Sequence, residues 1–166
     1  DLIRLAAGLG ASCSFDAVVT PKNDGDRSPL AARAGEKALE ALLSDPEADP
    51  FVAAGTHAGK KDILFCQAGR NFVNITPFGD VTPCLQFPVA AENLNKNAFE
   101  HIWKNSELLN RMREDVVSAI RPCSSCRLLR YCSRCPGLAH VETGDFTGKS
   151  PTCCEVASVR KEVYTH

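Results

Sequence analysis

Eight of the nine cysteines in this 166-residue chain lie between residues 66 and 154, and this grouping constrains the fold more than any other feature. In order they are Cys66, Cys84, Cys123, Cys126, Cys132, Cys135, Cys153 and Cys154. The four central cysteines have the spacing Cys-x2-Cys-x5-Cys-x2-Cys-Pro. Two-residue gaps let successive sulfur atoms turn back onto one centre while backbone amides point toward them. The fold must therefore bring together thiols from distant stretches of the chain.

The number and spacing of these thiols predict iron–sulfur clusters. One cluster needs about four thiolates around a small inorganic core, and two clusters need about twice that number. In two-cluster ferredoxins, the last cysteine of such a run, which precedes a proline, binds the other cluster. By analogy we assign Cys135 to a partner cluster. This leaves two incomplete ligand sets, Cys123, Cys126 and Cys132 in one, and Cys66, Cys84 and Cys135 in the other.

Other uses of cysteine explain the pattern less well. Paired Cys-x2-Cys zinc ligands are usually separated by about 15–20 residues, but here the gap is five. A single zinc would also leave Cys66, Cys84 and the Cys153–Cys154 pair without a role. A disulfide framework is typical of small secreted chains with an even cysteine count. The alternatives kept are a zinc-stapled interaction module without a redox role and an independent ferredoxin-like carrier.

Composition sets limits on the fold and on the partners. With 44% hydrophobic and 23% charged residues, the chain has room for one domain and part of another. A net charge of −1 argues against a nucleic-acid partner. No apolar run approaches the roughly 20 residues of a membrane span, so no membrane partner is predicted. We expect a reducing, cytoplasmic location. The histidines form no metal pattern, and no catalytic residue is assigned.

The N-terminal third is predicted to be a helix–strand–helix segment. Helical spacing covers residues 2–9, alternating burial suits a strand over 12–19, and a second helix is expected over 31–44. Such a segment has too few strands to close a sheet, so we expect it to be part of a larger domain. The start at Asp1 rather than Met indicates the same. A linker is predicted over residues 45–61, with a domain boundary near residue 55.

The remaining residues predict an α+β unit. Runs 72–76 and 81–85 form a hairpin around a turn at Gly79, which needs positive φ and brings Cys84 back toward Cys66. A capping box, Asn97-x-x-Glu100, is predicted to open one helix, with Trp103 as a core residue. Ser106–Glu107 is predicted to open a second helix, running through Val116 and ending before Pro122.

The cysteine-rich run is also locally cationic. Between residues 121 and 140 there are four arginines and no Asp or Glu, namely Arg121, Arg127, Arg130 and Arg134. One interpretation is that they stabilise a reduced cluster or dock an acidic peptide or redox donor. The other is that they are ordinary solvated side chains. Substitution of Arg127 and Arg130 would separate the two interpretations.

Several motifs carry a family resemblance. They are Cys66-Gln67-Ala68-Gly69, Asn74-x-Thr76-Pro77-x-Gly79-Asp80-Val81-x-Pro83-Cys84, Ile102-Trp103-x-x-Ser106, the Cys123 to Cys135 run, and Pro151-x-x-Cys154-x-x-Ala157. Over about residues 64–158 the chain resembles the SPASM extension of radical S-adenosylmethionine enzymes. The segments Phe15-Asp16, Asp24-Gly25, Ser28-Pro29-Leu30 and Arg33 resemble the end of that family's partial (β/α) barrel.

The resemblance implies two domains, a barrel remnant with linker over residues 1–54 and a SPASM domain over 55–166. It implies two auxiliary [4Fe-4S] clusters, the first bound by Cys66, Cys84 and Cys135 and the second by Cys123, Cys126, Cys132 and Cys154. Two features depart from the family: the last gap of the run is two residues instead of three, and no cysteine lies between Cys66 and Cys84. The first cluster is therefore expected either to have an open iron or to be closed by Cys153, which is otherwise a spare thiol.

The resemblance also implies partners. Enzymes of this kind often modify peptides, so a peptide or protein substrate is expected, with a flavodoxin or ferredoxin as redox donor and the radical S-adenosylmethionine barrel as the missing catalytic part. The implied role of this chain is electron relay and substrate positioning in a maturase. The family's Cys-x3-Cys-x2-Cys loop is absent from these residues. S-adenosylmethionine is therefore expected only in the full-length parent enzyme, and this chain alone is predicted not to catalyse the reaction.

Overall fold

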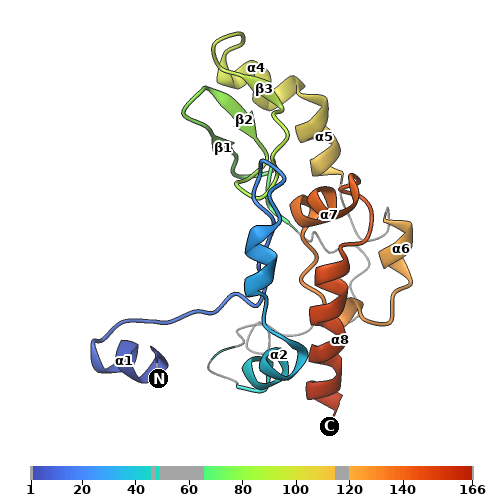
Figure 1. The fold of residues 1–166 in the computed structure, drawn as a ribbon. Coiled ribbons are helices and arrows are strands. Elements are labelled where there is room, and N and C mark those ends of the chain that lie inside the picture. Colours follow the sequence, from blue (N-terminus) through green and yellow to red (C-terminus); the bar gives the residue numbers. More distant parts are fainter. Residues whose placement is uncertain (1, 46–47, 49–65, 115–119, 166) are drawn as a thin grey trace.

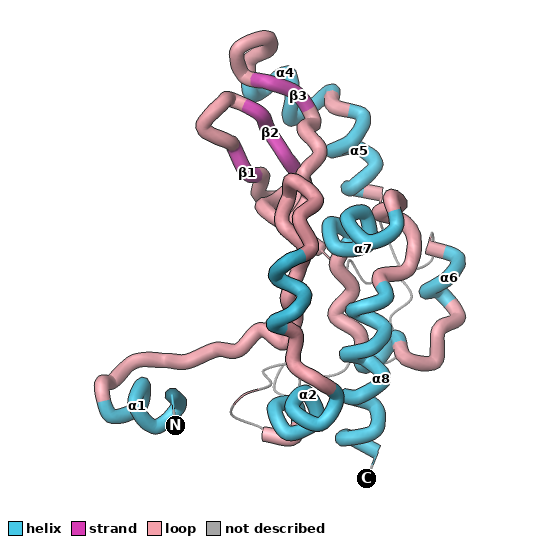
Figure 2. The backbone as a smooth tube through the Cα atoms, in the orientation of Figure 1, coloured by secondary structure: helices cyan, strands magenta, loops and turns pink. Residues whose placement is uncertain are grey.

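The computed structural model of the chain describes residues 2–45, 48, 66–114 and 120–165. These residues form an α+β fold in which one small antiparallel sheet lies at one end, beside α4 and α5, and the other helices lie away from it (Figures 1 and 2). Most of the predicted linker over 45–61 and the predicted boundary near residue 55 lie outside the described residues. Within the described ranges, every helix falls short of the length and hydrophobicity that a membrane crossing requires.

The N-terminal segment contains only helices and loop. Its elements are α1 (Leu2–Gly8), the 3₁₀ helix η1 (Ser28–Ala32) and α2 (Glu36–Leu43). The strand predicted over residues 12–19 is wrong, since this stretch is irregular (Figure 2). The backbone N–H of Val18 instead donates to the Asp16 carboxylate at 2.9 Å, a local turn that competes with strand pairing. Without this strand, the structure does not confirm the predicted barrel remnant.

The helix predicted over residues 31–44 is divided in two. Its second half is α2, but Arg33 has extended backbone angles of φ −60° and ψ 136°, and Gly35 is the N-cap of α2 with φ −68° and ψ 164°. The Arg33 side chain donates from Nε to the Val19 carbonyl at 2.9 Å, so this break ties the helices to the preceding loop. The buried residues of α2, Leu39 and Leu43, pack against the C-terminal helix.

The predicted hairpin is present, and its strands are shorter than expected. β1 (Asn74–Ile75) pairs antiparallel with β2 (Asp80–Thr82), and Gly79 has the expected positive φ of 85°. A third strand that the sequence pattern did not reveal, β3 (Glu92–Asn93), pairs with the other edge of β2. The turn is fixed from this side by Asn93, whose side-chain amide donates to the Phe78 carbonyl at 3.1 Å.

Two short helices follow the sheet, α4 (Phe99–Asn105) and α5 (Glu107–Arg113). The predicted cap of α5 is confirmed, because Ser106 Oγ accepts from the Leu109 backbone N–H. The predicted capping box of α4 is wrong: its N-cap is Ala98, and the Asn97 amide instead donates to the Glu92 carboxylate at 2.8 Å. Trp103 packs against the core cluster of Val81, Ile102 and Leu109, as predicted. Val116 lies outside the described residues.

The C-terminal part consists of α6 (Arg121–Ser124), the 3₁₀ helix η3 (Leu129–Tyr131), α7 (Pro136–Thr143) and α8 (Pro151–Thr165). The sequence patterns predicted none of these helices. In Figure 1, α8 lies beside α2. Their contact is a core cluster of Leu39, Leu43, Val156 and Val159, against which Ala17 and Val18 also pack. Residues 17–18 and α2 of the N-terminal segment are therefore packed onto the helix that carries Cys153 and Cys154.

Candidate metal centre

Four of the predicted ligands line a single cavity of about 360 Å³. Cys123 lies on α6 and Cys126 just after it, Cys132 follows η3, and Cys154 lies in the first turn of α8. These are the four cysteines assigned by resemblance to the second auxiliary cluster. The rest of the wall is mostly apolar and includes Pro122, Leu128, Leu129, Pro151 and Ala157. A cavity walled by thiols and apolar groups suits a core that binds sulfur and excludes water.

The thiols of this cavity lie close enough to influence one another. The pKa of the Cys132 thiol is raised to about 12, chiefly by burial and then by the neighbouring thiols of Cys153, Cys154, Cys123 and Cys126. Burial likewise raises the pKa of the Cys154 thiol, followed by the effects of Cys123 and Cys126. The Cys132 and Cys154 thiols are therefore poorly solvated and lie close to Cys123 and Cys126. Without a cationic core, the protonated form of these two thiols is favoured.

Two cations stand at this cavity. Lys149 is part of its lining. Burial raises the pKa of the Cys123 thiol, while the Arg134 guanidinium, through its charge and a hydrogen bond, and the Lys149 ammonium act in the opposite direction. Arg134 is only 3% exposed and donates to the carbonyls of Phe146 and of Gly148, the latter at 3.2 Å. A buried guanidinium therefore stabilises negative charge on Cys123 Sγ.

The structure separates the arginines that sequence analysis treated together. Arg127 and Arg130 are exposed, and the Arg130 guanidinium lies 5.1 Å from the centre of the Tyr131 ring. Arg134 alone among these three is buried. Lys149 was missed because it lies outside the cysteine-rich run and carries no motif of its own. Both interpretations of Arg127 and Arg130 stay predictions, and the cations whose charge lowers the pKa of the Cys123 thiol are Arg134 and Lys149.

The three cysteines of the other set also come together. Cys66 and Cys84 pack against the same buried cluster, which contains Ala68, Phe87, Met112 and Phe146. The pKa of the Cys135 thiol is raised to about 11, chiefly by burial; the Leu138 N–H acts in the opposite direction, and the thiols of Cys153, Cys84 and Cys66 add smaller increases. Cys66 also raises the pKa of Cys84, after the larger effect of burial. The hairpin thus returns Cys84 toward Cys66, as predicted.

Backbone amides point at the sulfur atoms of this set. The N–H of Ala68 donates to Cys66 Sγ and the N–H of Leu138 donates to Cys135 Sγ, each at 3.4 Å. Such N–H···S bonds favour the thiolate form that binds iron.

A close backbone approach at Gly137 brings Cys135 to the segment after Cys84. A Cβ atom on Gly137 would stand 3.0 Å from the carbonyl oxygen of Gln86 and 3.3 Å from the Phe87 nitrogen. The need for a residue without a side chain at position 137 was not predicted, because Gly137 lies inside a helix and has no positive φ that would mark a turn.

Cys153 lies between the two sets. It is 5% exposed, and it raises the pKa of both the Cys132 and the Cys135 thiols. Its Sγ donates to the Ser133 carbonyl at 3.7 Å, a contact that a protonated thiol makes and a ligand thiolate does not. Its place beside Cys135 suits a closing ligand, and its hydrogen bond suits a spare thiol. That Cys153 closes the first cluster and that it is a spare thiol therefore both stay predictions.

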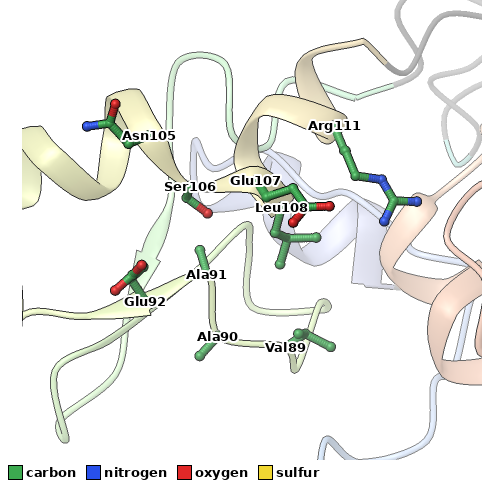
Figure 3. A pocket seen from close by; sticks show the side chains of 9 residues that line it. All are labelled: Val89, Ala90, Ala91, Glu92, Asn105, Ser106, Glu107, Leu108 and Arg111. Carbon is green, nitrogen blue, oxygen red and sulfur yellow. The ribbon is translucent and has the colours of Figure 1, made fainter.

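Another hollow lies away from the cysteines (Figure 3). This cavity of about 490 Å³ is formed by residues 89–92 and by the junction of α4 and α5, with Glu107 and Arg111 among its lining. Neither Cys nor His lines it, so it offers no thiolate ligand for iron. Across the described ranges, no three His, Cys, Asp or Glu side chains are grouped so that they could hold a single metal ion.

The buried thiols predict an alkaline loss of stability in the cluster-free, reduced chain. Because the pKa values of Cys132 and Cys135 are raised from 9.0 to about 12 and about 11, the folded chain holds these protons more tightly than the unfolded chain. Their contribution to stability is complete below about pH 9 and is lost as the pH rises toward 11 and 12. We expect the melting temperature, measured under reducing conditions, to fall over this range. A melting temperature that stays level up to pH 11 would contradict this account.

Comparisons with known proteins agree with this site. The SPASM family model, an iron–sulfur cluster-binding domain, matches residues 66–136. The chain is 29% identical over 102 residues to an AdoMet-dependent heme synthase of Methanosarcina barkeri, covering 61% of this chain and 29% of that protein. It is 36% identical over 95 residues to a PqqA peptide cyclase of Bradyrhizobium diazoefficiens, covering 51% and 24%. No solved structure matches. The chain thus spans less than a third of the curated relatives named here.

Proposed function

We propose that this chain, which carries the SPASM iron–sulfur cluster-binding domain of radical S-adenosylmethionine enzymes over residues 66–136, is the auxiliary-cluster part of a peptide-modifying maturase. The observation that carries the proposal is the cavity lined by Cys123, Cys126, Cys132 and Cys154. These residues come from three separate segments, and the last of them lies outside the range of the family match.

Two clusters are proposed, each of the [4Fe-4S] type. The second is held by the four cavity thiols, and the first by Cys66, Cys84 and Cys135, with the boundary of the SPASM domain near residue 55. When bound, such clusters supply electrons one at a time. The chain's own residues would supply sulfur ligands, N–H···S hydrogen bonds and two nearby cations. These parts support our proposal of an electron relay between a redox donor and the active site of the parent enzyme.

The substrate and the catalytic part are proposed from the relatives. Two of them are named PqqA peptide cyclase, and two are named AdoMet-dependent heme synthase. A peptide or protein substrate is our first choice, because the cyclases share the higher identities with this chain, 36% and 32% against 29% and 27%, and a tetrapyrrole is the second. S-adenosylmethionine would bind to a barrel that precedes this domain in the parent enzyme.

Metal analysis of the anaerobically purified chain tests the proposal against the zinc-stapled alternative. Two clusters predict brown protein with about eight iron and eight sulfide per chain. Colourless protein with one or two zinc ions and no acid-labile sulfide would favour an interaction module. Because zinc thiolates have no redox chemistry, reversible bleaching by a low-potential reductant is a second, independent readout.

Arg134 is predicted to set the potential of the second cluster. Replacing it with Gln removes a buried positive charge from a thiolate-bound, anionic cluster, so the reduced form loses stabilisation. We expect the midpoint potential to fall by several tens of millivolts, where about 59 mV is a tenfold change for a one-electron couple. EPR-monitored redox titration measures this shift. Arg134→Lys should restore most of the potential, and Arg127→Gln should leave it unchanged. Equal potentials in Arg134→Gln and Arg127→Gln would refute the assignment.

A further inference from the structure

The carboxylate of Glu142 joins parts of the chain that sequence analysis did not connect. Glu142 lies near the end of α7, and its side chain is 10% exposed. Its Oε2 accepts from Ser150 Oγ at 2.6 Å, and its Oε1 accepts from Thr152 Oγ1. Arg33 Nη2, from the N-terminal segment, lies 3.5 Å from the same Oε1. This largely buried carboxylate on α7 thus contacts Arg33, at the break before α2, and Ser150 and Thr152, at the start of α8.

The start of α8 depends on these contacts. Ser150 is 2% exposed and directly precedes α8, and its Oγ accepts from the Cys153 N–H at 3.1 Å. Its carbonyl accepts from the Cys154 N–H at 3.0 Å. A serine in this position caps the helix and fixes the direction of its first turn. Because Glu142 orients the Ser150 hydroxyl, it also fixes where the Cys154 backbone lies at the cavity.

Arg33 extends the connection to the N-terminal segment. Its Nε donates to the Val19 carbonyl at 2.9 Å, so the guanidinium is anchored in the loop before η1. Its Nη2 is buried and makes no hydrogen bond within the described residues, so the ion pair with Glu142 is its observed compensation there. Farther along α8, Tyr164 Oη donates to the Leu43 carbonyl at 3.0 Å. The N-terminal segment therefore holds α8 near both of its ends.

We propose that Glu142 is a positioning residue for Cys154, and that its pair with Arg33 couples the N-terminal segment to the second cluster. This inference rests on the proposed function, since it takes Cys154 as a cluster ligand. Glu142 acts through Ser150 and does not itself contact the sulfur atoms. A displacement of the N-terminal segment would be transmitted to the ligand through Arg33, Glu142 and Ser150.

The physical basis is the cost of unpaired buried groups. Without the Glu142 carboxylate, the hydroxyls of Ser150 and Thr152 lose their acceptor, and the buried Arg33 nitrogen loses its counter-charge. Residues that orient metal ligands typically change metal affinity by about 10–100-fold when they are replaced. The Arg33 contribution should be smaller, because its side chain is 30% exposed and its ion pair is long.

Cluster release tests this proposal in the reconstituted full chain. The variants are Glu142→Gln, Arg33→Gln and the control Glu155→Gln, which removes the same charge from an exposed position on α8. Each is also made in a Cys84→Ser background, where the second cluster is expected to remain alone. The readouts are the rate of iron loss to a chelator, the EPR spectrum of the reduced cluster and the melting temperature.

We expect Glu142→Gln to release the second cluster about tenfold faster or more and to change its EPR spectrum. Arg33→Gln should act in the same direction more weakly, and Glu155→Gln should match the parent chain. If Glu142→Gln lowers the melting temperature strongly, the EPR spectrum and the iron-release rate of Arg33→Gln test the proposal in its place. Release rates and spectra identical to those of Glu155→Gln in both variants would overturn the inference. A parent chain without clusters would instead overturn the proposed function.

Discussion

Replacing Cys126 with serine is expected to halve the iron content of the anaerobic chain, from about eight to about four atoms, because the second cluster loses a thiolate ligand. Cys126 lines the cavity with three other cysteines and is remote in sequence from Cys66 and Cys84. The first cluster should therefore remain, with its EPR spectrum unchanged. Iron and sulfide analysis, together with EPR of the reduced protein, measures both effects.

The reciprocal variant makes this prediction sharper. Cys84→Ser should remove the first cluster and keep the second, so that the two residual spectra add up to the spectrum of the parent chain. Cys13→Ser is the matched control, because Cys13 lies in the N-terminal segment and is not part of the cavity lining. It should retain the full iron content. Loss of the same spectrum in Cys126→Ser and Cys84→Ser would contradict two separate ligand sets.

Gly137→Ala is expected to abolish the first cluster although no ligand is changed. In an exposed helix, alanine is favoured over glycine by about 1 kcal/mol. Here the added Cβ would stand 3.0 Å from the carbonyl oxygen and 3.1 Å from the carbonyl carbon of Gln86. The obstacle is backbone and cannot rotate away. Helix α7 must then move from the segment after Cys84, which separates Cys135 from Cys84.

Iron analysis and thermal unfolding measure the effect of this substitution. We expect about four iron atoms per chain and a lowered melting temperature. Gly8→Ala is the matched control, since Gly8 also lies in a helix and nothing stands within 4 Å of its added Cβ. A Gly137→Ala chain that loads iron and unfolds like Gly8→Ala would show that the close approach does not position Cys135.

The sequence predicted features that depend on local chemistry. Gly79 has its positive φ because a tight turn needs it, and Ser106 caps α5 because a hydroxyl can accept the Leu109 N–H. The α+β class also followed from local patterns. The ligand sets stay predictions, and the place of Cys154 in the second set came from resemblance, because no spacing rule links Cys154 to a run that ends at Cys135.

Features that depend on tertiary contacts could not be predicted. The strand over residues 12–19 failed because alternation alone supplies no pairing partner, and an Asp16 side chain captures the Val18 N–H instead. The Asn97 side chain does not cap α4 as predicted, because its amide donates to the Glu92 carboxylate, five residues away in sequence. The roles of Arg134, Gly137 and Glu142 could not be predicted, because each depends on a contact with another segment of the chain. The contacting segments are distant in sequence or have no recognisable motif.

Mössbauer spectroscopy of the anaerobic chain is the most direct test of two clusters held by pooled thiols. The account predicts that the spectrum is that of four-iron clusters and that these contain nearly all of about eight iron atoms per chain. A spectrum of iron bound singly by four sulfur atoms, or a chain that binds zinc and no sulfide, would contradict it.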